Sequence, residues 1–447
     1  MRNMIQIRKF AIGNRSGLRA HLLRSAIGVG GLKILSMILV MASSILFARG
    51  LGPDGYGKYV FVMAVIGLIA LPVGPGYDQY ITREVARYHL EEKWGLFRGF
   101  LRRSNQWVGM SSVLIALVIA LVASRQATWA VDDHWTLLFV ASLMLPLLGF
   151  GALQSSVLRG LSCVFHAQIP DLLVRPGLHL LIAGGILMTG ILSPVTVLIS
   201  QICAATGARL FGAWFVRRNR PKVVISTSPQ YLDREWGKAL WPFMLMVTVS
   251  TLNSQIGVLV LGWLGDHADV GLLRVAQSGS MLVVLSLTIV NIVIGPYVAR
   301  AHRAGDIRQM MALSRQSAFA AITVALPIAL PLIFLGGPVV RLIYGEAYVD
   351  GVTLPLAILS GAELINVSFG SVGLFLVMSG YERDTLIGHF SALIGNAIAA
   401  FVLIPSMGVI GAAVASAIGL VTWNLVLAVK FSQRLRFRPS FFVKGRQ

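Results

Sequence analysis

The chain has 447 residues, of which 56% are apolar and only 13% are charged. A soluble domain carries about 25% charged residues, so this composition excludes a soluble globular protein and favours a polytopic membrane protein. The formal net charge of +20 would suit a nucleic-acid-binding protein, but the basic residues gather in the links between long apolar runs, so we expect no nucleic-acid partner.

Residues 1–25 form a basic tail, and the apolar run that follows, 26–48, is longer than the core of a signal peptide. We therefore expect this run to be retained as the first transmembrane helix. Similar runs recur along the chain, and about 20 apolar residues are enough to cross a bilayer as a helix. The sequence predicts about twelve spans, at 26–48, 59–80, 105–124, 136–157, 171–191, 195–216, 239–263, 272–298, 316–335, 353–379, 386–405 and 409–429.

The basic link 217–238 separates these spans into two groups of six. We expect an all-α integral membrane protein with an N-terminal half at 26–216, a C-terminal half at 239–429 and a basic cytoplasmic tail at 430–447. A faint repeat supports the division, because ARGLGPDGYGKY after the first span has a counterpart, LGWLGDHADVGLLR, after the seventh. Transporters often place their substrate path between two such halves, so a central cavity is expected.

The distribution of charge predicts which side of the membrane each link faces. With the N-terminus in the cytoplasm, the cytoplasmic links and tails hold 30 of the 38 Lys and Arg residues, and four others lie within the predicted spans. The external links hold the last four, namely Arg49, Lys58, Arg125 and Arg341. Basic links stay on the cytoplasmic side of a membrane. We therefore predict that both termini are cytoplasmic and that the protein lies in the cell inner membrane.

The turn after the first span contains Gly52 to Lys58, which fits G-x-x-x-x-G-K, the start of a phosphate-binding loop. That motif needs Ser or Thr next, a preceding strand and a following soluble helix, whereas Tyr59 follows here and both flanks are apolar spans. A tight Gly/Pro/Asp reversal explains these residues instead. The second span is itself interrupted by LPVGPG at 71–76, so we expect a broken helix there.

No pattern typical of an enzyme is present. The sequence has no H-E-x-x-H motif and no complete phosphate-binding loop, and its two cysteines, Cys163 and Cys203, lack the spacing of a metal site. A membrane glycan polymerase or ligase is expected to expose a sizeable catalytic loop outside, but the longest external link is short, Gly336 to Gly351. We therefore expect a protein that is not an enzyme and that uses neither cofactor nor metal.

Ionisable side chains inside predicted spans are costly, so they mark a candidate substrate path. Counting from the span ends places Lys33 near mid-membrane, Arg175 and Arg209 in the cytoplasmic half, and Arg274 just inside the outer face. These four side chains are candidates for a cationic cavity that binds a diphosphate, because Arg offers a planar fork for phosphate oxygens and Lys a point charge. Snorkelling to the interface is the alternative, mainly for Arg175 and Arg274.

Two acids and several amides complete the candidate site. Glu363 is the acid at mid-depth, and Asp78 lies near the inner interface beyond the broken second span. Each is a candidate either for coupling an ion or for pairing with an embedded cation. Four amides within spans are candidates for contacts with sugar hydroxyls, although hydrogen bonding between helices is their more frequent use: Asn253, Asn291, Asn366 and Asn396.

ARGLGPDGYGKY, followed by a broken helix and ITREVARY, resembles the opening of bacterial polysaccharide-biosynthesis membrane proteins. These are the O-antigen-type lipid-linked oligosaccharide flippases of the multidrug/oligosaccharidyl-lipid/polysaccharide exporter superfamily. LIPSMGVIGAAVASAIG, after Asn396, is similar to the penultimate hairpin of the same proteins. The resemblance covers nearly the whole chain, and its motifs mark the family better than the substrate.

The resemblance implies a flippase that moves an undecaprenyl-diphosphate-linked oligosaccharide, an O-antigen or exopolysaccharide repeat, from the inner to the outer leaflet by alternating access. It implies a lipid-linked glycan, membrane lipids and glycan polymerase machinery as partners. Two alternatives stay open: a multidrug/cation antiporter of the same superfamily, and a flippase for a lipid-linked peptidoglycan precursor. One mid-membrane acid against several embedded cations favours an anionic substrate over a cationic drug.

Overall fold

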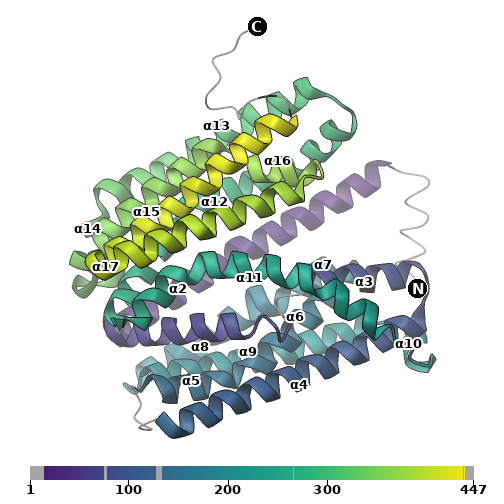
Figure 1. The fold of residues 1–447 in the computed structure, drawn as a ribbon, viewed down its shortest axis with the longest axis horizontal. Coiled ribbons are helices and arrows are strands. Elements are labelled where there is room, and N and C mark those ends of the chain that lie inside the picture. The colour runs from purple at the N-terminus through teal and green to yellow at the C-terminus, as the bar shows by residue number, and fades with distance from the viewer. Residues whose placement is uncertain (1–14, 75–77, 127–132, 265, 436, 438–447) are drawn as a thin grey trace.

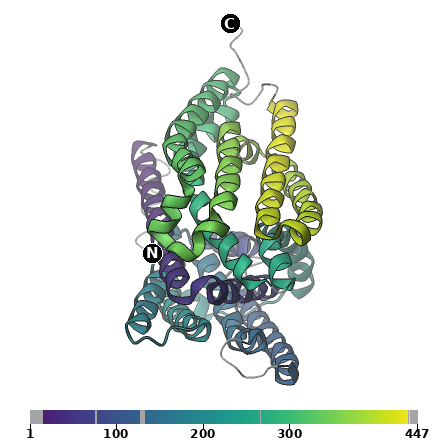
Figure 2. The same ribbon diagram turned by 90° about the vertical axis from the view of Figure 1, so that its left-hand side faces the viewer.

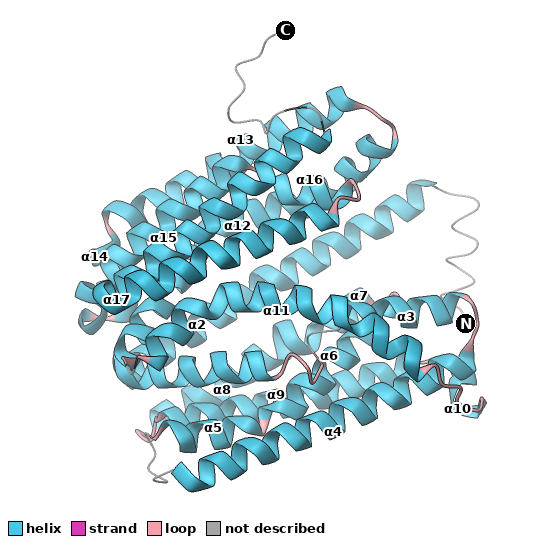
Figure 3. Ribbon diagram, viewed as in Figure 1, coloured by secondary structure: helices cyan, strands magenta, loops and turns pink. Residues whose placement is uncertain are grey.

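The computed structural model describes residues 15–74, 78–126, 133–264, 266–435 and 437. Within these ranges the chain forms helices and short connections and no β-strand (Figures 1 and 3). Ten helices there are long and apolar enough to cross a membrane. The predicted all-α membrane fold is confirmed, while the number of spans and their orientation stay predictions.

The helices divide into two layers (Figures 1 and 2). The first elements in the chain are α2 (Arg15–Ile69), α3 (Asp78–Leu90), α4 (Trp94–Gln126), α5 (His134–Ser142), α6 (Met144–Gly160), α7 (Val164–Ile169), the π-helical turn η2 (Pro170–Val174), α8 (Arg175–Met188), α9 (Pro194–Asn219) and α10 (Val223–Ser226). They are followed by α11 (Asp233–Trp263), α12 (His267–Arg303), α13 (Ile307–Phe334), α14 (Gly336–Tyr344), the 3-10 turn η3 (Glu346–Tyr348), α15 (Val349–Phe369), α16 (Val372–Met378) and α17 (Glu382–Leu435). Figure 1 shows α12 to α17 in the upper layer and α3 to α10 in the lower one, with α2 and α11 between them.

Two long elements, α2 and α17, each consist of two arms joined at one glycine. The joints are Gly52 (φ 70°) in α2 and Gly408 (φ 53°) in α17, where the sequence predicts turns between neighbouring spans. Glycine adopts positive φ without the steric cost that a Cβ brings. The arms of α2 are linked by a 2.8 Å hydrogen bond between the hydroxyls of Ser44 and Tyr56. Each element is therefore a tight helical hairpin.

Two predicted spans end earlier than the apolar runs suggest. The span expected at 59–80 ends at Ile69, and residues 70–74 form a turn, because Pro72 cannot donate the backbone hydrogen bond that a continuing helix needs. The predicted break is thus confirmed at Pro72 and Gly74, while Pro75 and Gly76 lie outside the described residues. The span expected at 353–379 stops at Phe369, where Gly370 has a φ of 71°, and α16 is a separate short helix.

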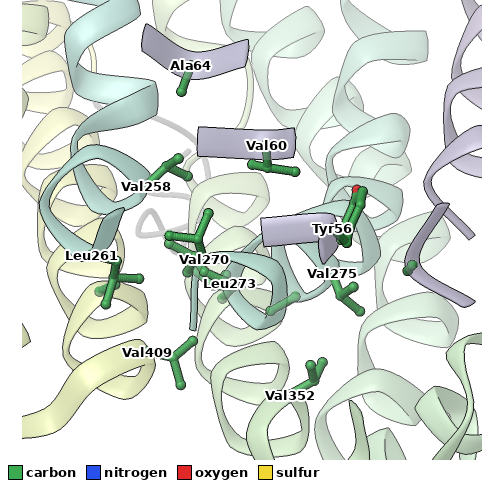
Figure 4. Close-up of a cluster of buried hydrophobic side chains, with 14 of the residues drawn as sticks. Tyr56, Val60, Ala64, Val258, Leu261, Val270, Leu273, Val275, Val352 and Val409 are labelled. Carbon is green, nitrogen blue, oxygen red and sulfur yellow. The ribbon is translucent and has the colours of Figure 1, made fainter. Parts of the chain in front are cut away.

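The second arm of α2 packs between α11 and α12 at the centre of the molecule. Figure 4 shows Tyr56, Val60 and Ala64 of α2 among apolar side chains of α11, α12, α15 and α17. At the hairpin end the backbones themselves meet, because a Cβ added to Gly57 would overlap the carbonyl oxygen of His267. A Cβ on Gly271 would likewise overlap the carbonyl oxygen of Pro53. The hairpin of α2 and the start of α12 are therefore in backbone contact at this end, which the charge distribution predicts to be external.

The basic link predicted at 217–238 packs onto α3 and α4 at the opposite end. The amide of Gln230 donates to the carbonyl of Gly95 at 2.9 Å, and Arg103 pairs with Asp233. The indole N–H of Trp236, a side chain only 4% exposed, donates to the hydroxyl of Tyr88 at 2.8 Å. The link therefore ties the start of α11 to the first part of the chain. The basic tails predicted at 1–25 and 430–447 lie largely outside the described residues.

Candidate binding cavity

Two adjoining cavities lie between the two layers of helices. The smaller cavity, of about 380 Å³, is lined by both arms of α2 and by residues of η2, α8, α9, α11 and α12. The larger cavity, of about 820 Å³, is lined by the first arm of α2 and by residues of η2, α11, α12, α15 and α17. Both fall in the usual size range of small-molecule sites or near it. They share five wall residues: Ser36, Val40, Leu172, Arg274 and Ser278.

Three of the four predicted cations line these cavities. Arg175 lines the smaller cavity, Lys33 the larger one, and Arg274 both. Within the described residues none of the three forms an ion pair. Tyr56, on the second arm of α2, lies beside Arg274. The cavity walls therefore carry three cations that form no ion pair within the described residues.

Arg209, the fourth predicted cation, does not line either cavity. Its side chain is 9% exposed and pairs with Asp171, which itself belongs to the wall of the smaller cavity. The guanidinium lies against Gly151, where an added Cβ would overlap it. This placement corrects the prediction that Arg209 lines the cavity. The rotation of α9 places the Arg209 side chain behind the wall, where it contacts Asp171. Its effect is to neutralise that acid.

Glu363 lines the larger cavity and is held by amides. The side-chain amide of Asn366 donates to one carboxylate oxygen of Glu363 at 2.9 Å, and Asn424 donates to the amide oxygen of Asn366 at 3.0 Å. In the described part of the chain Glu363 has no cationic partner. Of its two candidate roles, pairing with an embedded cation is therefore absent from this conformation.

The placement of Glu363 leads to a test of ion coupling. We expect Glu363→Gln to keep its melting temperature, because the amide preserves the shape of the side chain and leaves no cation unpaired. Transport into reconstituted vesicles should lose its response to an imposed proton or sodium gradient. Glu382→Gln, a change of an exposed carboxyl at the start of α17, serves as the matched control. A marked loss of thermal stability in Glu363→Gln would instead indicate that the carboxylate supports packing.

The remaining predicted residues fall into two sets. Asn253 and Asn396 line the larger cavity, where the amide of Asn396 donates to the carbonyl and the side-chain oxygen of Asn253 at 2.9 and 3.1 Å. Asn291 lines neither cavity, and Asn366 lies behind Glu363. Asp78 begins α3 and pairs with Arg159 at 2.8 Å, away from both cavities. The structure therefore brings two of the four amides to the cavity and does not bring Asp78.

Several cavity residues were not singled out from the sequence. The structure adds Tyr56, Tyr59 and Gln201 to the smaller cavity, and Gln277 and Trp423 to the larger one. Gln255, His179 and His389 also line these cavities, although their residue types favoured packing or hydrogen bonding between helices. Lone histidines, aromatics and amides inside apolar runs are usually used for packing, so their residue type alone does not mark them. The useful signal is the hairpin GYGKY, which places two tyrosines on the arm that enters the centre of the molecule.

The family of the chain follows from a comparison of its sequence with family models. The model described as "Polysaccharide biosynthesis protein" matches residues 22–302, which is more than half of the chain. The chain belongs to the polysaccharide biosynthesis protein family. The resemblance seen at ARGLGPDGYGKY is thereby confirmed. No curated protein matches the chain.

Solved structures show which fold this polysaccharide biosynthesis protein has. An inward-facing multidrug resistance MATE family transporter of the MOP superfamily aligns with a TM-score of 0.71 and 18% identity over 92% of this chain and 98% of that chain. The lipid II flippase MurJ, in an inward closed conformation, aligns with a TM-score of 0.71 and 14% identity over 89% and 86%. A MOP superfamily transporter from Pyrococcus furiosus, described as having a binding pocket of reverse polarity, aligns with a TM-score of 0.63 and 15% identity over 93% and 95%. The chain has the fold of the MOP superfamily, and these neighbours are transporters or flippases, not enzymes.

Proposed function

We propose that the protein is a flippase that moves an undecaprenyl-diphosphate-linked oligosaccharide from the inner to the outer leaflet by alternating access. The observation that supports this most is the charge of the cavity wall. Lys33, Arg175 and Arg274 are unpaired within the described residues, and Asp171 is already neutralised by Arg209. Membership of the polysaccharide biosynthesis protein family supports a glycan as the cargo.

The energetics of embedded charge favour an anionic ligand. An unpaired cation inside a membrane protein is costly, and that cost falls when an anion enters the same cavity. Arginine binds phosphate oxygens through two parallel hydrogen bonds, and the shared wall residue Arg274 lies where the two cavities meet. A diphosphate at this junction would contact Arg274 together with Arg175 on one side or Lys33 on the other.

The cationic-drug antiporter is less well supported by the same wall. A drug cation would be attracted by embedded carboxylates, and Glu363 is the one acid of the cavity wall in the described residues that has no cationic partner. Three unpaired cations in the same space would repel such a substrate. The charge balance therefore favours the flippase over the antiporter.

The conformation fits one step of alternating access. Backbone contact between Gly57 and His267 closes the end of the molecule that we propose to be external, with both termini in the cytoplasm and the protein in the inner membrane. In that orientation the described conformation would receive its cargo from the cytoplasmic side. A glycan polymerase outside the membrane would then use the flipped repeat, and we propose it as a functional partner.

Removal of the protein from cells tests the proposal. We expect an undecaprenyl-diphosphate-linked repeat to accumulate on the cytoplasmic leaflet and surface glycan to disappear, with export restored by a plasmid copy. Lipids would be extracted from depleted cells and identified by mass spectrometry, with leaflet location read by accessibility to an added glycosidase. Accumulation of the lipid-linked peptidoglycan precursor instead would assign the protein to that alternative. Drug hypersensitivity with normal surface glycan would favour the antiporter.

A further inference from the structure

An aromatic pair lies in the wall of the larger cavity. The rings of Trp423 and His389, both on α17, have centroids 4.0 Å apart and planes inclined by 41°. The indole lies over Gly388, where an added Cβ would be 3.1 Å from the ring. Because Gly388 has no side chain, the indole can lie against the opposite arm of the hairpin. The pair therefore places two tilted aromatic rings in contact at the edge of the cavity.

Polar groups with free hydrogen-bonding capacity surround this pair. The indole N–H of Trp423, the imidazole of His389 and the side-chain amide of Gln277 have no hydrogen-bond partner within the described residues. None of these three groups is sealed from the cavity as a buried unpaired atom. The Glu363 carboxylate contributes a second oxygen, since Asn366 occupies only the other one. Donors and acceptors that face a cavity without protein partners are available to a ligand.

The larger cavity differs in chemistry from the smaller one. The smaller cavity holds Arg175 and the tyrosine pair Tyr56 and Tyr59, whereas the larger one holds the Trp423–His389 pair, Glu363 and three side-chain amides. Arg274 belongs to both walls. A phosphate bound at Arg274 would therefore place the group attached to it in the larger cavity, whose volume of about 820 Å³ is more than twice that of the smaller one.

We propose that the larger cavity is a saccharide subsite, in which Trp423 stacks on the C–H face of a sugar ring while Gln277, His389 and Glu363 bond its hydroxyls. The inference rests on the proposed function, since the sugar reaches this cavity as part of a lipid diphosphate. A tryptophan suits this role because it offers a broad apolar face and one polar N–H. An organic cation would also stack on an indole near a carboxylate, but Lys33 lines the same cavity and repels it.

The subsite would also discriminate between glycans. A site that holds unpaired donors and acceptors rejects a ligand that cannot bond them, because those groups then stay desolvated without a partner. The diphosphate site, in contrast, binds the part that all such lipids share. Affinity for the lipid diphosphate and selectivity for the sugar are therefore assigned to different walls of one continuous space.

Binding to the purified full-length protein in nanodiscs tests this division. The probes are undecaprenyl diphosphate, the same lipid carrying one N-acetylhexosamine, and tetraphenylphosphonium as an organic cation. We expect Trp423→Ala to weaken binding of the sugar-bearing lipid about tenfold, the size of one lost aromatic contact, and to leave the bare lipid within about twofold. Arg175→Ala should weaken both lipids. Trp241→Ala, a change of a tryptophan that is 60% exposed and lines neither cavity, is the matched control.

Two further variants distinguish loss of the subsite from loss of folding. Trp423→Phe should keep most of the affinity for the sugar-bearing lipid, and Gln277→Ala should weaken that lipid alone without removing a ring. Equal weakening of both lipids by Trp423→Ala and by Gln277→Ala would overturn the subsite, as would selective loss of tetraphenylphosphonium binding. If Arg175→Ala had no effect on binding of the bare lipid, that result would instead contradict the proposed function. Failure of the subsite and failure of the proposed function therefore give different results.

Discussion

Replacing Arg175 and Arg274 together by alanine should abolish glycan export while the protein still accumulates in the membrane. Both guanidinium groups line the smaller cavity and neither has an ion-pair partner in the described chain, so their removal leaves no carboxylate unpaired. A hydrogen bond to a charged group contributes about 1.5–3 kcal/mol, or roughly a tenfold to hundredfold change in affinity for each residue. The double change is therefore expected to reduce export by about a thousandfold.

Surface glycan and membrane protein level would be measured in the same cells. Lysine at both positions should retain part of the activity, because it keeps the charge but loses the planar fork. Arg125→Ala, at the exposed end of α4, is the control for loss of one arginine. Full surface glycan in the double variant, at matched protein level, would show that the two arginines do not hold the cargo.

Arg209→Ala provides an internal contrast to those variants. Arg209 is buried and pairs with Asp171, so its removal would leave that carboxylate unpaired against the cavity. Removing one partner of a buried ion pair is destabilising, and here the cost is reduced because the Asp171 side chain is 34% exposed. Its main effect should therefore be on protein level. The same substitution thus has different consequences at two arginines that the sequence placed at similar depth in neighbouring spans.

This contrast shows what the sequence could and could not predict. The apolar runs predicted the helical membrane fold, and the Gly/Pro/Asp turn at Gly52 and the short gap between the spans 386–405 and 409–429 marked the two hairpin turns, because both signals are local. Whether Arg175 or Arg209 faces the cavity depends on the rotation of each helix against its neighbours, which local spacing does not determine. The second span ends early, at Ile69, because Pro72 breaks the helix. Pro72 is a local signal, but a span drawn from hydropathy alone runs past it.

The surroundings of Glu363 show the same limit. Its hydrogen-bonded chain runs through Asn366 to Asn424, which lies 58 residues further along the sequence on α17. Trp423 enters the larger cavity because Gly388, on the other arm of α17, leaves room for its indole. Such contacts join residues from different arms or helices. A residue type and its depth in a span were enough to select candidates, but not to select their partners.

Gly57→Val is expected to hold the hairpin end of the molecule open and to abolish transport. A Cβ at this position would overlap the carbonyl oxygen of His267, and backbone atoms cannot move aside as a flexible side chain can. The helices α2 and α12 would have to separate at this end, which we propose to be external. Gly67→Val lies on the same arm, where an added Cβ meets no atom within 4 Å, and it serves as the matched control.

Cysteine labelling would measure this opening. With Cys163 and Cys203 replaced by serine, a cysteine at Gln255 in the smaller cavity would be treated with an impermeant thiol reagent added to intact cells. We expect labelling to rise severalfold in Gly57→Val and to stay at the wild-type level in Gly67→Val. Unchanged labelling and normal export in Gly57→Val would show that the backbone contact is not required for closure. If labelling rises in the Gln255→Cys background and export is lost in Gly57→Val with Gln255 in place, closure of this end is a necessary step of the transport cycle, because the export assay leaves the cavity residues unaltered.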